Sequence, residues 1–442
     1  MRSHECLRVL LVGAALGAAV LLVPGEAPAG EPLKLQEIAE RYADTGDLAQ
    51  AKAALDKLKV KPADFLKALK HARPHLSVDF GSSKVPFEDG HGRKTDLHVR
   101  APSESEAISS MREGGCVCVI ALHGRTLDGS SHIPIARKIG PEGRTVVLGP
   151  TAQKLPKGME PDSLSKAFLD SVPHWWLYDS TRSFPMEALR WAKRRFPIDT
   201  DRVFLSGYSM GGHGTWNIGL RFPDRFAGIA PCAGALTERD IASDPQAKAL
   251  LGNARNLEPW FTHGENDETE PVANARKLDA ALTDMGIHHV YEEIKGGAHL
   301  LPLFFGGGNV ASLSSWAAPR KRNPAPEKID YASIGDYADG AFWLRIAKRT
   351  GRGTIKLQGT VEKKQNVIRV SAEGPVSDLD VYLDDRLLDF KKKITIEVPG
   401  MDPVTVEKVE LDNETILESW RSREDPKLVY GARVHVALKR KN

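Results

Sequence analysis

The sequence has almost no excess of charge of either sign. Its 442 residues include 61 Lys and Arg against 58 Asp and Glu, a formal charge of +3. Nucleic-acid-binding domains are usually strongly basic, so neither nucleic acid nor an anionic membrane is indicated as the main partner. The hydrophobic fraction of 41% and the charged fraction of 27% are ordinary for a soluble globular protein. The length predicts two or three structural units.

Motifs for common cofactors are also missing. The sequence has no Walker A lysine loop, no G-x-G-x-x-G at a strand–helix turn and no H-E-x-x-H. Asp199 and Asp201 could form a calcium pair, but an Asp turn that introduces a strand explains them more simply. The sequence therefore predicts neither a metal nor a cofactor.

Cysteine is scarce, with four residues in the chain. Cys6 lies before an N-terminal apolar run, which leaves Cys116, Cys118 and Cys232. An odd number means that at least one thiol stays free or pairs with another molecule. Cys116 and Cys118 share one face of a predicted strand, which favours buried core thiols over a metal or redox role. Whether any disulfide forms stays open at this stage.

Only one long apolar run is present, from Leu7 to Val23. Basic residues precede it, and the small residues Ala27-Pro28-Ala29 follow it, as in a secretory signal peptide. The alternative is a membrane anchor, but a run of about 17 residues is at the lower limit for spanning a bilayer. We therefore expect a signal peptide over residues 1–29, cleavage after Ala29, and a secreted or periplasmic protein without a stable membrane span.

The pattern along the chain predicts four further regions. Residues 30–75 show apolar residues at helical spacing and are predicted to be a helical segment without chemistry of its own. Residues 76–318 alternate short apolar strands with helix-like stretches, which predicts an α/β fold with a mostly parallel sheet covered on both faces. Residues 319–345, rich in Pro and basic residues at their start, are interpreted as a linker. Residues 346–442 alternate with period two and predict a small β-sandwich.

Ser209 lies in the G-x-S-x-G pattern Gly207-Tyr-Ser-Met-Gly211. The five letters alone are a weak match in a chain with 39 glycines. The apolar strand Val203-Phe-Leu205 before them and a predicted helix from Gly212 to Phe222 after them supply the context that a nucleophile elbow requires. Ser209 is therefore predicted to be a catalytic nucleophile.

An acid and a histidine follow Ser209, in the chain order Ser, acid, His that nucleophile elbows on this type of sheet use. Asp267 lies just past the predicted strand that ends at His263-Gly264, with Glu265, Glu268 and Glu270 as nearby rivals. His299 follows the last predicted strand and a Gly pair, and is favoured as the base. Three other histidines at or near strand ends compete less well: His123, His213 and His263.

Two further sets of residues complete the predicted site. The backbone N–H groups of Met210 and Arg125, or Thr126 in place of Arg125, are predicted to bind the oxyanion. Trp175, Trp176 and Tyr208 are candidate substrate contacts, although the tryptophans could equally form a small satellite core.

These motifs resemble the α/β-hydrolase superfamily. The segments that carry the resemblance are Asp199–Trp216, Arg221–Pro231, Leu122-His-Gly124, the acid loop from His263 to Val272, and Gly-Gly-Ala-His299. The resemblance covers about Asp79 to Trp316. The most similar branch comprises secreted carboxylesterases related to polyhydroxybutyrate depolymerase and feruloyl esterase, together with prolyl-oligopeptidase-like predicted peptidases. The chain departs from the pattern at Glu270, where an apolar residue commonly precedes the proline.

The resemblance implies a serine esterase with a Ser209–Asp267–His299 triad that needs no cofactor. Its substrate would be a small-molecule or polysaccharide-linked ester. Two alternatives remain: a serine peptidase of the prolyl-oligopeptidase type, and a binding protein with an inert hydrolase domain.

Overall fold

The computed structural model describes residues 30–76, 80–88, 94–152, 175–177, 183–237, 241–302, 306, 308–335 and 338–438. The predicted signal peptide over residues 1–29 lies outside the described residues. No helix among the described residues is both long enough and apolar enough to cross a bilayer.

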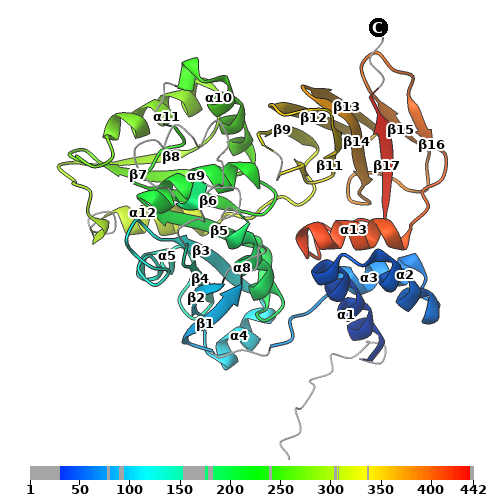
Figure 1. Ribbon diagram of the computed structural model, residues 1–442, viewed down its shortest axis with the longest axis horizontal. Coiled ribbons are helices and arrows are strands. Elements are labelled where there is room, and N and C mark those ends of the chain that lie inside the picture. The colour runs from blue at the N-terminus through cyan, green and yellow to red at the C-terminus, as the bar shows by residue number, and fades with distance from the viewer. Residues whose placement is uncertain are drawn as a thin grey trace, which may run out of the picture.

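The central region is built on an eight-stranded sheet with the order β1-β2-β4-β3-β5-β6-β7-β8 (Figure 1). The strands from β3 to β8 run parallel, whereas β2 pairs antiparallel with both β1 and β4. This confirms the predicted α/β fold with a mostly parallel sheet. The strands are β1 (Ser82–Glu88), β2 (Lys94–Arg100), β3 (Cys116–Leu122), β4 (Thr145–Pro150), β5 (Ile198–Tyr208), β6 (Gly228–Cys232), β7 (Trp260–Gly264) and β8 (Val290–Ile294).

Helices cover both faces of this sheet, which explains why its central strands are apolar throughout. On β3, Cys118 and Ile120 belong to the hydrophobic cluster on one face, while Val117 and Val119 belong to the cluster on the other. Successive side chains of a strand point to opposite faces, so a continuous apolar run fills both clusters. The helices are α4 (Glu104–Met111), α5 (Ile133–Ala136), α8 (Phe184–Lys193), α9 (Met210–Arg221), α10 (Pro245–Leu251), α11 (Val272–Asp284) and α12 (Gly308–Ala317).

The three described cysteines are free and buried. Cys116 and Cys118 lie in the same cluster, as expected for residues two apart on a strand. Burial raises the pKa of both thiols above the ordinary value. These cysteines therefore pack as core residues in the described structure, without a disulfide between them.

The C-terminal region forms two sheets that share one hydrophobic core. One sheet has the order β16-β15-β13-β12-β9, and the other β10-β11-β14-β17. Their bounds are β9 (Lys328–Ser333), β10 (Gly340–Ala341), β11 (Leu344–Arg349), β12 (Ile355–Glu362), β13 (Val367–Glu373), β14 (Val376–Leu383), β15 (Ile394–Glu397), β16 (Val404–Val406) and β17 (Ala432–Ala437).

The extent predicted for the linker, residues 319–345, is wrong. β9 lies inside this range and pairs antiparallel with β12, and the side chains of Ile329 and Tyr331 are buried in the core between the two sheets. β9 is short and follows Pro324 and Pro326, so the composition around it is typical of a linker. Its partner β12 lies further along the chain, and the local sequence does not indicate this pairing. The sandwich therefore begins near residue 328.

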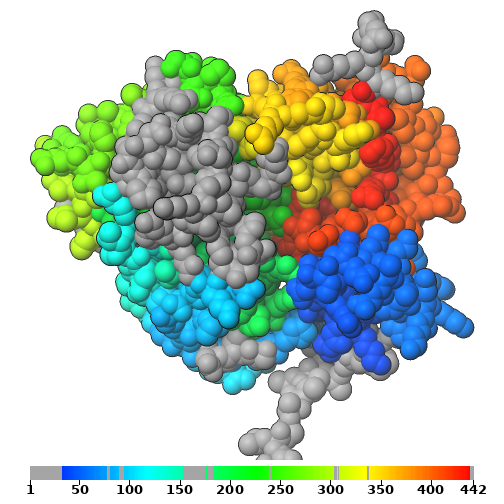
Figure 2. Space-filling model, in the orientation of Figure 1, coloured from blue at the N-terminus to red at the C-terminus, as the bar shows by residue number. Residues whose placement is uncertain are grey.

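The N-terminal helical segment is present as α1 (Gly30–Thr45), α2 (Leu48–Lys57) and α3 (Pro62–Lys70). These helices pack against α13 (Asn413–Arg423) from the other end of the chain, through a cluster that includes Leu55, Phe65, Leu417 and Trp420. Figures 1 and 2 show α13, in orange-red, beside the blue N-terminal helices. The sequence pattern did not predict α13, because period-two strands surround it.

Ion pairs join the central region to the C-terminal region, and those of Arg322 are buried. Arg322 contacts Asp201 Oδ1 and Asp425 Oδ2, each at 2.7 Å. Lys427 Nζ donates to Asp199 Oδ1 at 2.9 Å and to Asp201 Oδ2 at 2.7 Å. The two aspartates that sequence reasoning weighed as a calcium pair thus hold basic side chains.

Acid sensitivity is expected at a second buried pair, between Asp224 and Arg423. Arg423 Nε donates to Asp224 Oδ2 at 2.7 Å. Burial raises the pKa of Asp224, but the charges of Arg423 and Arg225 outweigh this effect and lower the pKa to about 2. The unfolded value is about 3.9. Because the folded pKa is the lower one, this contribution to stability is full above about pH 4 and is lost as the pH falls toward 2.

We therefore expect Asp224→Asn to lower the guanidinium midpoint at pH 7 and to weaken its decline between pH 4 and pH 2. Asp330→Asn, at a half-exposed carboxylate 4.0 Å from Arg255, is the matched control and should leave that decline unchanged. Guanidinium unfolding of both variants, followed by tryptophan fluorescence at a series of pH values, measures the midpoint and its decline. An unchanged acid decline in Asp224→Asn would contradict this assignment.

Candidate active site

Ser209 occupies a sharp turn between the end of β5 and the start of α9. Its φ of 57° lies in the left-handed region, which is strained for a residue other than glycine. A Cβ at Gly207 would lie 2.2 Å from the carbonyl oxygen of Gly211, and a Cβ at Gly211 would lie 2.0 Å from that of Leu122. Both glycines of the motif are therefore required by close backbone approach. The turn places Ser209 at the carboxyl end of a central strand.

Three side chains from different loops meet at this turn. The Ser209 Oγ and His299 Nε2 atoms are 2.9 Å apart, and His299 Nδ1 and Asp267 Oδ2 are 2.6 Å apart. Asp267 lies in the loop after β7, and His299 in the loop after β8. An ionised carboxylate only accepts hydrogen bonds, so Nδ1–H donates to Asp267, and Nε2 is left to accept from the serine hydroxyl. The structure thus brings together the three residues that the sequence singled out.

The environment of Asp267 keeps its carboxylate charged. Burial raises its pKa, but hydrogen bonds from His263, His299 and the backbone N–H of Glu270 outweigh burial and hold the pKa well below its usual range. Oδ1 accepts from the N–H groups of Thr269 and Glu270, at 3.0 and 2.8 Å. An acid fixed in this way can orient an imidazole and stabilise its protonated form.

The rival acids of the same loop have other contacts. Glu265 Oε2 accepts from the N–H of Gly296 at 2.8 Å, Glu268 is exposed, and Glu270 Oε2 lies 3.2 Å from His213 Nε2. Of these four acids, Asp267 is the one whose carboxylate meets His299.

The rival histidines are buried and have partners other than Ser209. His123 Nδ1–H donates to the Gly124 carbonyl at 2.7 Å, and its Nε2 accepts from the N–H of Ala152 at 2.9 Å. Burial lowers the pKa of His123, in keeping with a neutral ring. His263 Nε2–H donates to the carbonyl of Glu270 at 2.7 Å.

The predicted oxyanion donors lie on the two segments that border Ser209. Met210 is the first residue of α9, so its N–H has no acceptor within the helix and lies at the positive end of the helix dipole. Arg125 is exposed in the loop after β3, which abuts the elbow: a Cβ at Gly124 would lie 3.3 Å from Tyr208 Cδ1. Thr126, the alternative donor, has a φ of 64°. The oxyanion assignment stays a prediction.

The three candidate substrate contacts differ in placement. Tyr208 is buried, and its hydroxyl donates to the carbonyl of His299 at 3.0 Å, so it supports the loop of the histidine. Trp176 has no exposed surface, and its indole N–H donates to the carbonyl of His123 at 3.0 Å. The structure therefore places Trp176 in the core, the alternative that the sequence left open. The side chain of Trp175 lies outside the described residues.

Two exposed leucines lie beside predicted site segments in the chain and were not singled out from the sequence. Leu300, directly after His299, is 57% exposed, and Leu127, in the loop after β3, is 41% exposed. Single exposed leucines are common on protein surfaces, so it is their place next to the predicted site that makes these two candidate substrate contacts. In the sequence, the only feature that could have identified Leu127 and Leu300 is that each lies next to a predicted site segment.

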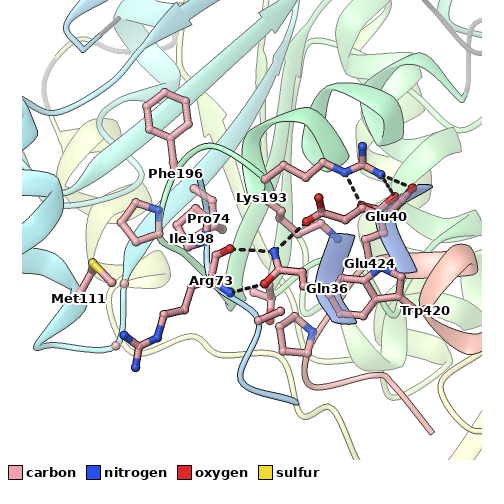
Figure 3. A pocket seen from close by; sticks show the side chains of 17 residues that line it. Gln36, Glu40, Arg73, Pro74, Met111, Lys193, Phe196, Ile198, Trp420 and Glu424 are labelled. Carbon is pink, nitrogen blue, oxygen red and sulfur yellow. Dashed lines mark hydrogen bonds and ion pairs between the residues drawn. The ribbon is translucent and has the colours of Figure 1, made fainter. Parts of the chain in front are cut away.

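The described structure also has a cavity of about 240 Å³ at the junction of α1, α8 and α13 (Figure 3). Its polar side chains already bond to one another: Gln36 Nε2 donates to Glu40 Oε1 at 2.7 Å, and Arg194 pairs with Glu424 at 2.6 Å. This cavity contains no nucleophile next to a base. Within the described residues, no group of three or more His, Cys, Asp or Glu side chains could hold a metal ion.

Comparisons with known proteins give matches to parts of the chain. Residues 186–302, which include Ser209, Asp267 and His299, match the family described as Phospholipase/Carboxylesterase. A bifunctional acetylxylan esterase/xylanase from Neocallimastix patriciarum is 25% identical over 203 residues, which cover 44% of this chain and 24% of that protein. The chain thus matches about a quarter of the length of this curated relative.

Two of the solved structures that are similar to part of the chain are the following. An S-formylglutathione hydrolase from Staphylococcus aureus is 16% identical, with a TM-score of 0.41, over 54% of this chain and 99% of that one. A ferulic acid esterase from Anaeromyces mucronatus is 15% identical, with a TM-score of 0.39, over 54% of this chain and 90% of that one.

Proposed function

We propose that this chain, an α/β-hydrolase that resembles carboxylesterases, hydrolyses carboxylic esters through an acyl-enzyme on Ser209. The observation that carries the proposal is the pair of contacts at His299, 2.9 Å to Ser209 Oγ and 2.6 Å to Asp267 Oδ2. A nucleophile, a base and a group that orients the base are the parts that acyl transfer to a hydroxyl requires.

In the first half of the reaction, Ser209 Oγ attacks the ester carbonyl carbon while His299 Nε2 takes the hydroxyl proton. The N–H groups of Met210 and Arg125 stabilise the oxyanion, and each such donor is typically worth about 3 kcal/mol. The tetrahedral intermediate collapses as His299 gives its proton to the departing alkoxide. The alcohol leaves, and the acyl group remains on Ser209.

In the second half, His299 removes a proton from a water molecule, which attacks the acyl-enzyme. The new tetrahedral intermediate releases the carboxylic acid, and the proton returns to Ser209. Asp267 keeps Nδ1–H in place and stabilises the imidazolium that forms in both halves. No step in this sequence uses a metal or a cofactor.

The substrate that we propose is a small-molecule or polysaccharide-linked ester. The exposed Leu127 and Leu300 would contact an apolar part of the acyl or alcohol group. The acetylxylan esterase named among the relatives favours a small acyl group on a saccharide. The N-terminal apolar run, with Ala27-Pro28-Ala29 after it, supports export of the enzyme to such substrates.

A matched pair of substrates tests the proposed activity. We expect the protein without residues 1–29 to hydrolyse p-nitrophenyl acetate and to leave p-nitroacetanilide, the amide with the same acyl group, uncleaved. Cleavage of the anilide at a comparable kcat/KM would support the peptidase alternative. If neither compound is cleaved, and no other ester in a short-chain series is cleaved, the result would favour the inert binding protein.

A further inference from the structure

Glu270 is an unexpected residue in the acid loop. It stands directly before Pro271, where the resembled family commonly has an apolar residue, yet its side chain is buried and only 9% of the residue is exposed. A carboxylate is costly to bury unless it is paired and hydrogen-bonded. Its contacts therefore show what the chain gains at this position.

Glu270 contacts four different parts of the site. Through its side chain, Oε2 lies 3.2 Å from His213 Nε2, and Oε1 accepts from Asn274 Nδ2 at 3.2 Å. Through its backbone, the N–H donates to Asp267 Oδ1 at 2.8 Å, and the carbonyl accepts from His263 at 2.7 Å. One residue thus connects the acid of the triad to a histidine on the elbow helix.

His213 is fixed just behind the nucleophile. It lies on α9, one turn after Ser209, and its backbone N–H donates to the Ser209 carbonyl at 3.0 Å. Its ring is buried, and Nδ1 lies 3.0 Å from the N–H and 2.9 Å from the carbonyl of Ala235. Nδ1 therefore has a partner whether or not it carries a proton, and a proton on Nε2 can be donated to Glu270.

We propose that Glu270 is a positioning residue that joins the acid loop to the elbow helix through His213. In this arrangement, the contacts of Glu270 and His213 fix the position of Asp267 relative to Ser209. The distance between these two residues is then the one that the His299 imidazole bridges. This inference rests on the proposed function, because it concerns the same triad.

The electrostatics of Glu270 agree with this geometry. Burial raises the pKa of its carboxyl group, but the charge of His213 and its hydrogen bond, with the amide of Asn274, outweigh burial and leave the pKa below the ordinary value. Glu270 is therefore a charged partner for His213, which makes the hydrogen bond stronger than a neutral one.

The expected consequence is kinetic. His299 bridges Ser209 and Asp267 with contacts of 2.9 and 2.6 Å, so a small displacement of the acid loop lengthens one of them. A displacement of about 1 Å in a catalytic group can cost about 100-fold in rate. Glu270 touches neither Ser209 nor the predicted oxyanion donors, so its loss should lower kcat and leave KM nearly unchanged.

The test uses four variants with p-nitrophenyl acetate as substrate. We expect Glu270→Ala to lower kcat by about 10- to 100-fold with KM within about twofold of wild type. Glu270→Gln, which can still accept from His213, should recover most of the loss. The double variant Glu270→Ala/His213→Ala should lose no more than Glu270→Ala, because the two residues act as one unit. Glu268→Ala, an exposed acid of the same loop, is the matched control and should behave as wild type.

Three results would overturn the positioning role. They are a wild-type kcat in Glu270→Ala, a larger loss of kcat in the double variant than in Glu270→Ala, or no recovery of kcat in Glu270→Gln. Circular dichroism establishes that each variant is folded. If Glu270→Ala does not fold, His213→Asn, whose side chain is too short to reach Glu270, carries the test with the same expected fall in kcat. An unchanged kcat in that variant would also overturn the role.

A fluorophosphonate probe separates failure of this inference from failure of the proposed function. If the wild-type protein neither hydrolyses esters nor reacts with the probe at Ser209, the proposed function fails. If the wild type reacts and Glu270→Ala reacts at the same rate, the proposed function stands and the role of Glu270 is excluded.

Discussion

Replacing Ser209 by alanine is expected to lower kcat/KM for p-nitrophenyl acetate by at least about 10⁴-fold. The variant loses the oxygen that forms the acyl-enzyme, while His299 and Asp267 remain in place. Residual hydrolysis would come from binding and the oxyanion donors alone. Initial rates corrected for spontaneous hydrolysis of the ester measure the effect.

Ser206, on the strand β5 that precedes Ser209, provides a matched control. Its hydroxyl donates to the carbonyl of Ala230 at 2.9 Å and lies 3.0 Å from His132 Nε2, so it has no contact with His299. We expect Ser206→Ala to keep most of the wild-type kcat/KM. A comparable loss in both variants would point to damage to the elbow rather than removal of a nucleophile, and wild-type activity in Ser209→Ala would contradict the mechanism.

Replacing Asp267 by asparagine is expected to lower kcat by about 10⁴-fold at pH 7, with a small effect on KM. The amide is uncharged, so it no longer stabilises the imidazolium, and its NH₂ group can favour the tautomer of His299 that cannot accept the serine proton. The pKa of Asp267 is held below its usual range, so the wild-type carboxylate is fully ionised at this pH. Steady-state kinetics of the folded variant measure the loss.

The control for Asp267 is Glu268→Gln, which makes the same chemical change one residue away on an exposed side chain. It should leave kcat and KM at the wild-type values. A variant Asp267→Asn with kcat within about tenfold of wild type would exclude Asp267 as the orienting acid, since the loss in related triads is far larger.

The sequence predicted the central sheet well because its strands are bounded by local features. The predicted strand that carries Cys116 and Cys118 is present as β3, a continuous apolar run that ends before His123, and the last predicted strand before His299 is present as β8, which ends before Lys295 and a Gly pair. The order of Ser209, Asp267 and His299 followed from strand ends, because the carboxyl ends of parallel strands meet at one edge. Contacts between distant segments could not be obtained in this way.

α13 and β9 illustrate what local patterns miss. The apolar residues of α13, such as Leu417 and Trp420, face helices that are more than 300 positions away in the chain, so nothing nearby in the sequence identifies their partners. Glu270 is a second case: it was weighed as a rival acid, and its partner His213 lies on a different element. Trp176 is a third case: its side chain is fully buried, so this aromatic residue near the site is a core residue and not a substrate contact.

The ion pairs of the C-terminal region lie far from the triad. Asp199 and Asp201, which hold Lys427 and Arg322, are at the start of β5, whereas Ser209 follows its end. At about 3.3 Å per residue, this strand separates the two aspartates from Ser209 by roughly 26 to 33 Å. Changes in these ion pairs are therefore expected to affect stability more than the chemical step.

Covalent capture of the nucleophile tests the central claim most directly. The protein without residues 1–29 is incubated with a fluorophosphonate probe, digested and analysed by tandem mass spectrometry. The account predicts one adduct, on Ser209, which is absent in Ser209→Ala and present in Ser206→Ala. A wild-type protein that does not react, or an adduct on another residue that persists in Ser209→Ala, would contradict it.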